Sequence, residues 1–547
     1  MQCLFFVAAA LLLACCGDEQ GVDPGSPVIS FFPAGQERVV RVGDSVVLSA
    51  VVDNAARPVF SWKTGGKIVS TERVYAFRAG RVGDYFVNLR VDADNGSAEE
   101  QVKVSVLEVL PPRITLPSSV IAFAGIDKIF AAEGEWAEGA RYVWRLEGEV
   151  VGEDSAYVFH QTEIRPYALT LRVTTDDGQD LKTINVTVLP EQSPELFFDN
   201  GRYRSPANAG ERRAMTVPEG RTLVLAPVML NIPSPATFEW KVDGVLQAAA
   251  GEYFAFAPAA GKYNVTVTER SSGATGEVEV TCTAPEGTYR RTGGATRYAA
   301  NAFHYMPAPG QFVNSIAAAT PEAALGALKA WCGREGSYFH IGAFGGYYIV
   351  GFDHSVENKA GVPDLAIGGN PFAGWCESGI VWVMQDENGN GLPDDTWYEL
   401  KGSETGKPET RQRYALTYYR PSADNLPPIW MDNMGRTGSV NRVGGYPRFI
   451  TEDYYTLVGT CLNSTFGTIG GLESSRCYDW GYVDSINNSA ERPASGQFWI
   501  EDAVQVDGSP VNLKFIDFVK VHTAVNAQGA AVGEVSTESY IPIDLNF

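Results

Sequence analysis

One pattern occurs three times in the first half of this chain and constrains its fold more than any other feature. The segments VFSWKTGGKIV, RYVWRLEGEVV and TFEWKVDGVLQ place an aromatic residue two positions before Trp62, Trp144 and Trp240, and a polar turn with glycine follows each tryptophan. A strand with a tyrosine near its start comes next, in DYFVNLRVDADNG, PYALTLRVTTDDG and GKYNVTVTERSSG. Apolar and polar residues alternate there, as in half-buried strands. Because a tryptophan under a facing strand fills the centre of a two-sheet sandwich, we expect three successive β-sandwich modules.

These segments resemble PKD and related immunoglobulin-like modules of surface proteins, which have a tryptophan strand, a glycine turn and a Y-x-V-x-L-x-V strand. They differ from the strict PKD pattern W-D-F-G-D-G because Lys63, Arg145 or Lys241 follows the tryptophan. The resemblance implies spacers that hold a terminal domain away from a membrane; a stacked aromatic binding face on one module is the alternative. Proline-rich joints at VLPPRI and PEQSPEL place the modules at 27–108, 109–190 and 191–284.

The repeat is absent from residues 285–547, where the sequence predicts a larger domain. TPEAALGALKAWCG predicts one short helix, with Thr320 as N-cap, Pro321 in the first position and Gly333 after the end. Other segments, such as SGIVWVMQD, RYALTYYR, SGQFWIEDAVQV and VNLKFIDFVKVHTA, have the aromatic and β-branched composition of strands. We therefore expect a mainly β chain that ends in a jelly-roll-like β-sandwich, with large loops that carry binding sites.

The first residues, MQCLFFVAAALLLACCGDEQG, contain an apolar run that is too short to span a bilayer and is typical of a signal peptide, here residues 1–14. LLAC resembles a bacterial lipobox, which makes Cys15 the predicted acylated residue and 15–26 the anchor and linker. A secreted protein cleaved near Ala14 is the alternative. CGDEQG resembles the acidic export signal of Bacteroidetes surface lipoproteins. We expect a lipid anchor on the extracellular face of the outer membrane.

Charge, cysteines and motifs exclude several function classes. The net charge of -22 argues against a nucleic-acid partner, because phosphate binding needs a basic surface. No cysteine belongs to a CxxC pair, so a zinc site is not expected. Cys461 and Cys477 could form a disulfide or remain buried thiols. GxSxG, HExxH, phosphate-loop and dinucleotide motifs are all absent from the sequence, and we expect no enzyme activity.

The segment DENGNGLPDDTW, which starts at Asp386, follows the spacing of an EF-hand-type loop. A hard cation needs six to eight oxygens, and alternate residues of a tight turn direct theirs inward, with Gly391 allowing the bend. Trp397 stands where a bidentate glutamate is usual, so Glu399 is the replacement. The pattern predicts structural calcium; an Asx/Gly turn without metal is the alternative. The predicted ligands are Asp386, Asn388, Asn390, the carbonyl of Leu392, Asp394, Asp395 and Glu399.

Six stretches of the last domain together resemble one family: HYMPAPGQFVN, GGYYIVGFDHSVEN, GIVWVMQDENGNGLPDDTWYELKGSE, YALTYYRP, CYDWGYVDSINNS and LKFIDFVKVHTAVNAQGAAVGEVSTE. They are similar to the terminal domain of Bacteroidetes PKD-containing surface lipoproteins, a group that includes the BtuH-type cobamide binders. The resemblance covers about half of the chain. It implies a surface lipoprotein that captures a corrinoid (vitamin B12 or another cobamide) and passes it to a TonB-dependent outer-membrane transporter.

The loops of this domain contain side chains that suit such a ligand. A corrinoid has an apolar ring edge and peripheral amides, so aromatic surfaces bordered by amide and hydroxyl groups fit it. His354 is a candidate cobalt ligand, because neutral imidazole is a good one. Two other functions stay open: a carbohydrate-binding jelly roll and, less favoured, a glycan-active enzyme. The predicted ligand-binding residues are Trp375, Trp430, Asn433, Asn441, Tyr446, Tyr478, Asp479, Trp480 and Asn487.

Overall fold

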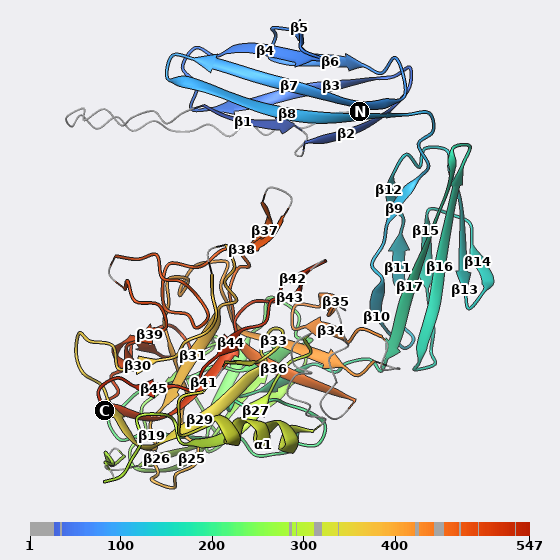
Figure 1. The fold of residues 1–547 in the computed structure, drawn as a ribbon. Helices are drawn as coiled ribbons and strands as arrows, with labels where there is room; N and C mark the ends of the chain where they lie inside the picture. The colour runs from blue at the N-terminus through green and yellow to red at the C-terminus, as the bar shows by residue number, and fades with distance from the viewer. Residues whose placement is uncertain are drawn as a thin grey trace.

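A computed structural model describes most of the chain, and it is nearly all β, as the sequence predicts. The described residues are 27–32, 36–283, 287–291, 293–310, 320–336, 338–372, 374–421, 426–441, 453–469, 472–490, 492–530 and 532–547. Within them, α1 (Pro321–Trp331) is the one α-helix. None of the described helices has the length and apolar character that crossing a membrane requires. Figure 1 shows two elongated modules joined end to end, followed by a larger body.

The three N-terminal modules use twenty-six strands. The first module contains β1 (Val28–Phe32), β2 (Glu37–Arg41), β3 (Ser45–Asp53), β4 (Val59–Thr64), β5 (Lys67–Ser70), β6 (Val74–Arg78), β7 (Gly83–Ala93) and β8 (Gly96–Leu107). The second contains β9 (Arg113–Thr115), β10 (Ser119–Phe123), β11 (Lys128–Ala131), β12 (Glu133–Glu135), β13 (Arg141–Leu146), β14 (Glu149–Gly152), β15 (Ala156–Phe159), β16 (Pro166–Thr175) and β17 (Gly178–Leu189). The third contains β18 (Glu195–Phe197), β19 (Ala214–Pro218), β20 (Leu223–Leu225), β21 (Val228–Leu230), β22 (Phe238–Val242), β23 (Val245–Leu246), β24 (Phe254–Phe256), β25 (Gly261–Glu269) and β26 (Thr275–Thr283).

All three modules share one sheet topology. The five-stranded sheet has the order β2-β8-β7-β4-β5 in the first module, and β10-β17-β16-β13-β14 and β19-β26-β25-β22-β23 repeat it. In each sheet the edge strand pairs in parallel with the last strand of the module, and the other pairs are antiparallel. Smaller sheets cover the opposite side of each core, which gives the expected sandwiches.

The repeated aromatic residues explain why the three sequences fold alike. The indole N–H of each repeat tryptophan donates to a backbone oxygen ten or eleven residues further on, at 2.8–3.0 Å, which satisfies its polar atom inside the core. The tyrosine hydroxyls of β7, β16 and β25 donate to the carbonyl four residues earlier, a tyrosine corner as in immunoglobulin-like domains. The fully buried tryptophans are Trp62, Trp144 and Trp240.

The larger body, which we call the head, comprises residues 287–547. Its elements are β27 (Asn301–Met306), α1, β28 (Phe339–His340), β29 (Tyr347–Glu357), β30 (Leu365–Ala366), β31 (Gly379–Met384), β32 (Tyr398–Leu400), β33 (Arg411–Tyr419), β34 (Ile429–Asp432), β35 (Thr437–Ser439), β36 (Tyr454–Cys461), β37 (Phe466–Ile469), β38 (Leu472–Ser475), β39 (Gln497–Phe498), a 3-10 turn (Ile500–Asp502), β40 (Ala503–Val504), β41 (Phe515–Thr523), β42 (Gln528–Gly529), β43 (Gly533–Glu534), β44 (Glu538–Ser539) and β45 (Ile543–Asp544).

Two sheets form the centre of the head. A six-stranded sheet, β27-β29-β41-β31-β32-β40, faces a four-stranded sheet, β35-β34-β33-β36. Tyr347, Ile349 and Leu457 belong to the core between them, whereas Tyr348 and Val350 point to the other face, because neighbouring residues of a strand alternate. That other face is covered by α1 and by the small sheet β39-β30-β45. The predicted caps of α1 are present: the Thr320 hydroxyl accepts from Ala323 N at 3.2 Å.

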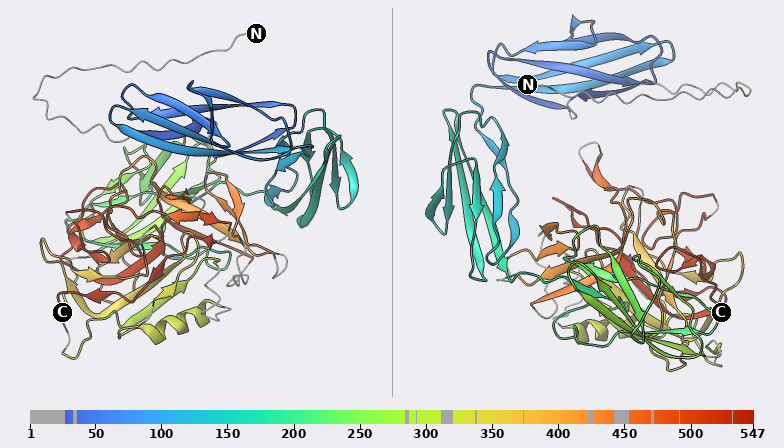
Figure 2. Two further views of the ribbon diagram at one scale, coloured as in Figure 1. Left: turned by 45° about the horizontal axis from the view of Figure 1, so that its top comes forward. Right: turned by 180° about the vertical axis from the view of Figure 1, so that it is seen from behind.

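The third module packs directly against the head. Phe197 and Val228 of the module form one apolar cluster with Ala415 and Val458 of the head. Figure 2 shows the third module, drawn in green, against the head. Apolar side chains on the outer surfaces of both bodies drive this contact, since each would otherwise face water. The second module meets the head through β10, where Ile121 joins an apolar cluster on β33 and β34.

One disulfide joins two loops of the head. Cys477 is bonded to Cys376, and its Cα lies 5.0 Å from the Cα of Cys376. Cys461 is a buried free thiol in the core between the two head sheets. Of the two alternatives that the sequence left open for Cys461, the structure has the buried thiol, because β36 directs this side chain into the core.

Candidate functional site

Most loops that carry the predicted ligand residues meet at one end of the head, which we call the loop end. The disulfide between Cys376 and Cys477 joins two of its segments. Asn441 joins two others, because it donates to Gln528 and Gly529 at 2.7 and 3.0 Å. In Figure 1 the hairpins β34–β35, β37–β38 and β42–β43 mark this end, on the side of the head away from α1. The loop end comprises the described residues of 370–376, 433–441, 463–490 and 526–534.

Three predicted residues near the disulfide are accessible to a ligand. Trp375 is half-buried, and its ring meets Phe466 edge-on with the centroids 6.2 Å apart. Trp480 is half-buried, with the guanidinium of Arg492 over its ring at 5.8 Å. Asp479 is exposed beside it. This part of the loop end thus offers aromatic surface next to a charged acceptor.

Two other predicted residues in the same segment build the loop. The Tyr478 ring is buried, and its hydroxyl donates to Asn463 O at 2.6 Å. The Asn487 amide donates to the carbonyls of Arg492 and Ala494 at 2.7 and 3.0 Å. The Tyr478 hydroxyl and the Asn487 amide nitrogen are used inside the protein, so both side chains shape the surface. Asn487 Oδ1 is buried and has no hydrogen-bond partner among the described residues.

The residues predicted on β34 and β35 are also mainly structural. Trp430 packs against Gly438, where an added Cβ would lie 2.4 Å from the ring. Asn433 binds two backbone groups of β33 beside its bulge, at 3.1 and 3.2 Å. Asn441 holds β42, as described above. Tyr446 lies outside the described residues.

A groove of about 510 Å³ separates the second module from β35 at the margin of the loop end. Its second-module wall includes Ser119, Lys128 and Ile129, and its head wall includes Ser439 and Asn441. This volume falls within the range of about 300–1,000 Å³ that is usual for small-molecule sites. The mixture of hydroxyl, amide and apolar groups suits a large ligand with both polar and apolar edges.

His354 does not offer a nitrogen to cobalt. The ring is 1% exposed, inside the head. Its Nδ1 lies 3.0 Å from Asp353 Oδ1 and its Nε2 lies 2.8 Å from Asp544 Oδ2. Both ring nitrogens are therefore engaged by carboxylates. The prediction of His354 as a cobalt ligand is corrected by this geometry.

Beside the disulfide, three carboxylates that the sequence did not single out come together. The carboxylate oxygens of Glu377, Asp484 and Glu538 lie within 4.8 Å of one another, and Asp484 and Glu538 are each 2% exposed. His340 Nδ1 lies 2.6 Å from Glu538. Burial and the charge of Glu377 raise the pKa of Glu538 to about 9. The group could hold a cation, but a proton shared between carboxyls relieves the same repulsion.

Local sequence carries no signal for this group. Its members come from positions more than fifty residues apart, on the loop before β31, the loop after β38 and β44. The pKa of Asp484 is also raised, first by burial and then by the charge of Glu538. Only the fold places the three acids together, since no spacing rule connects them.

The predicted calcium loop joins β31 to β32 and has the tight turn that the sequence indicates. Gly389 and Gly391 have φ values of 72° and 74°, a region open mainly to glycine. Asp386 Oδ2 accepts from Gly391 N at 3.0 Å, while its Oδ1 is buried and has no hydrogen-bond partner in the part of the chain that the structure describes. The Asn388 amide donates to Asp394 and Asp395 at 3.0 and 2.9 Å. Five of the predicted ligand side chains thus lie on one turn: Asp386, Asn388, Asn390, Asp394 and Asp395.

The carboxyl groups of Asp386 and Asp395 in this turn are buried, and one arginine lies close to the first of them. Burial raises the pKa of Asp395 to about 7 and also raises the pKa of Asp386. Arg290 lies 3.3 Å from Asp386 and 3.1 Å from Asp517, and compensates part of the negative charge. The Leu392 carbonyl accepts from Asp394 N at 3.0 Å. The Asn390 amide donates to Asp394 at 3.0 and 3.1 Å.

Glu399 does not join the other predicted calcium ligands. It lies in β32, and its buried carboxylate accepts a hydrogen bond from the Thr460 hydroxyl of β36. Burial raises the pKa of this carboxyl to about 7. The neighbouring Tyr398 faces the opposite side of the sheet, in the core beneath α1. The Glu399 side chain therefore points into the space between the two head sheets, and the prediction of Glu399 as a calcium ligand is corrected.

Comparison with known proteins identifies the first module. Residues 26–93 match a family described as a PKD-like domain. No curated protein matches the chain. Fibronectin(III)-like modules of CbhA from Clostridium thermocellum share 16% identity, cover 30% of this chain and 95% of their own, and give a TM-score of 0.18. Extracellular domains 3–5 of Drosophila OTK share 11% identity, cover 45% of this chain and 94% of their own, and give 0.19. The chain therefore contains a PKD-like module.

Proposed function

We propose that this protein is a lipid-anchored ligand-capture protein of the outer cell surface, acylated at Cys15, and that it is not an enzyme. Its head binds a corrinoid and passes it to a TonB-dependent outer-membrane transporter. The family resemblance of the head motivates the choice of ligand. The observation that carries the proposal is the loop end, where Trp375, Asp479 and Trp480 lie around one disulfide and a groove of about 510 Å³ borders the same end.

The chemistry of the loop end supports this ligand. Indole rings provide flat apolar surface for the edge of a corrin ring, and groups such as Asp479 and Ser439 can bind its peripheral amides. The disulfide holds the two loops in place before binding, which reduces the ordering cost of association. The first two modules then serve to carry the head away from the membrane.

Isothermal titration of the intact chain with cyanocobalamin tests the proposal. We expect saturable heat and a change in the absorption spectrum of the corrinoid. The variants Trp375→Ala and Trp480→Ala should each weaken binding by about tenfold, since loss of a contacting aromatic residue typically costs more than about 1 kcal/mol. Phe86→Ala, which removes a 51% exposed aromatic residue from the first module, is the matched control.

The outcomes separate the competing functions. Absence of both heat and a spectral change would contradict the corrinoid proposal. Saturable binding of a polysaccharide in its place, weakened by the same two tryptophan variants, would assign the loop end to glycan capture. Release of reducing ends from that polysaccharide would make the protein an enzyme.

We also propose that the turn after β31 binds a structural calcium ion. The supporting observation is Asp386, whose Oδ1 is buried without a partner in a turn lined by further carboxylate and amide oxygens. The asparagine amides would need to turn their oxygens inward when the ion binds, because they now donate to Asp394. The proposed ligands are Asp386, Asn388, Asn390, the Leu392 carbonyl, Asp394 and Asp395.

A further inference from the structure

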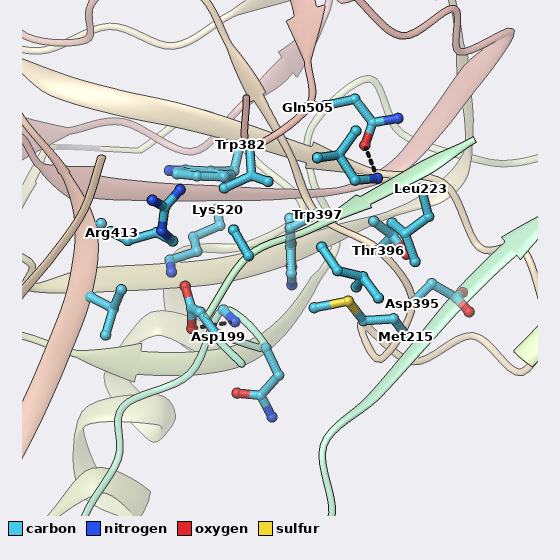
Figure 3. Close-up of a pocket in the computed structure, with 18 residues that line it drawn as sticks. Asp199, Met215, Leu223, Trp382, Asp395, Thr396, Trp397, Arg413, Gln505 and Lys520 are labelled. Carbon is cyan, nitrogen blue, oxygen red and sulfur yellow. Dashed lines mark hydrogen bonds between the residues drawn. The ribbon is translucent and has the colours of Figure 1, made fainter. Parts of the chain in front are cut away.

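A second cavity, distinct from the loop end, lies where the third module meets the head. It has a volume of about 90 Å³, and both bodies contribute walls. The head supplies Trp382, Trp397 and Lys520, while the module supplies Asp199 and Met215. Figure 3 shows Lys520 beneath the Trp382 ring, with Asp199 close to its ammonium end in this view. The cavity exists only because the two bodies are in contact.

Lys520 is a buried cation that faces this cavity. The residue is 4% exposed, and its Nζ lies 4.9 Å from the ring centroid of Tyr347 and 5.9 Å from that of Trp382. No described residue forms a hydrogen bond or a close ion pair with this ammonium; Asp199 is the opposite charge that acts on it. Burial lowers the pKa of Lys520. A buried charge is costly unless another group compensates it.

Two further donors line the same cavity without acceptors. Trp397 Nε1 and Arg413 Nε are both buried and have no hydrogen-bond partner. The Nη2 atom of Arg413 is paired with Glu252, which leaves Nε unused. A Cβ at Gly201 would lie 2.5 Å from Trp397 Nε1, so a larger residue than glycine would clash with the indole ring at this wall of the cavity. The cavity therefore presents three donors that lack acceptors among the described residues.

The charges of the lining favour an anion. Asp395 is turned into its own loop, where it accepts from Glu387 N and the Asn388 amide at 2.9 Å. Asp199 Oδ1 accepts from Gly201 N at 2.9 Å. Arg413 is already paired with Glu252, so the cation that favours an anion is Lys520, whose ammonium has no close ion pair among the described residues and interacts with Asp199 only through its charge.

We propose that this cavity binds a small carboxylate of about the size of acetate. Its oxygens accept hydrogen bonds from Lys520, Trp397 and Arg413, and its short apolar part lies against Met215. A ligand that contacts both bodies stabilises their contact, because it binds the docked state only. The proposal stands independently of the corrinoid site, which lies at the loop end.

Saturation-transfer NMR on the intact chain, with sodium acetate as the probe, tests the proposal. We expect transfer to the acetate methyl signal in the wild type and its loss in Lys520→Met. Methionine keeps the length of the buried side chain, and replacing a buried charge by an apolar group is often tolerated. Lys329→Met, on the exposed surface of α1, is the control and should keep the signal.

A second variant reduces the volume of the cavity and leaves its charged residues unchanged. Met215→Phe fills the cavity from the module side and should also abolish the acetate signal. Acetamide, the neutral analogue, should give at least tenfold less transfer than acetate. Three results would overturn the proposal: no transfer in the wild type, transfer retained in both Lys520→Met and Met215→Phe, or equal transfer to acetamide and acetate.

Discussion

Buried carboxyl groups govern how this protein responds to alkaline pH. Glu538 has an ordinary pKa of 4.5 and a folded-state pKa of about 9. A carboxyl whose pKa rises on folding contributes stability that is complete below its unfolded pKa and is lost as pH rises toward its folded pKa. Glu399 and Asp395, each with a pKa of about 7, act in the same direction. The alkaline side of neutrality is the informative pH window for these carboxyls, because burial lowers the pKa of His304 and His522 to about 3.

We predict that the free energy of unfolding falls by about 1–3 kcal/mol between pH 7 and pH 9. Each proton that the folded state still holds and the unfolded state has released lowers this free energy by about 1.4 kcal/mol per pH unit. Glu538→Gln removes one ionising group and should flatten this loss. Glu335→Gln, at an exposed position, should leave it unchanged. Urea unfolding at several pH values measures the slopes. If the free energy of unfolding falls equally with pH in the wild type and in Glu538→Gln, the raised pKa of Glu538 is contradicted.

At the scale of single elements, strand patterns predicted the long strands better than the short ones. VNLKFIDFVKVHTA forms β41 over nine residues, as expected. SGQFWIEDAVQV was expected to form one strand, but it forms β39, a 3-10 turn and β40. The interruption follows from a buried acid: Asp364 Oδ2 accepts from Ile500 N at 2.9 Å and draws the backbone away from the strand. An acid 136 residues away in sequence is invisible to a local pattern.

A separate prediction concerns calcium in the turn between β31 and β32. If calcium binds there, a chelator should lower the melting temperature of the intact chain by several degrees, because the ion binds only the folded turn. Asp386→Ala should melt near the temperature of the chelated wild type and should no longer respond to chelator. Asp507→Ala, in an exposed turn elsewhere, should keep the response. Scanning calorimetry of the three proteins, each with and without chelator, measures the six melting temperatures. An Asp386→Ala protein that melts at the wild-type temperature with and without chelator would count against calcium.

At the scale of the whole molecule, the third module and the head share a buried interface. Arg221 of the module lies 2.5 Å from Glu387 of the head, and Glu387 is 5% exposed. Gln505 of the head donates to Thr222 O of the module at 2.6 Å. The cavity with Lys520 lies in the same interface. A fragment that begins at residue 287 would expose these groups to water.

We predict that Arg221→Met destabilises the contact between module and head by about 3–5 kcal/mol, because it leaves Glu387 buried without its cation. Arg212→Met is the matched control on the same module. The Arg212 side chain is 58% exposed and pairs with Glu277 and Glu279, whose side chains are 51% and 24% exposed, so its loss should cost less than about 1 kcal/mol. Denaturant unfolding and limited proteolysis compare the two variants. Equal effects from Arg212→Met and Arg221→Met would show that the buried pair does not hold the interface.

The sequence by itself determined the features that depend on local pattern. Spacing of Trp62, Trp144 and Trp240 predicted the repeated sandwiches, and the caps around Thr320 predicted the helix, because periodicity and capping act over a few residues. The tertiary structure alone decided the partner of Cys477, the grouping of Glu377 with Asp484 and Glu538, and the docking of the third module. Those features join residues distant along the chain, and their energies come from burial and charge, which arise only when the sheets pack together.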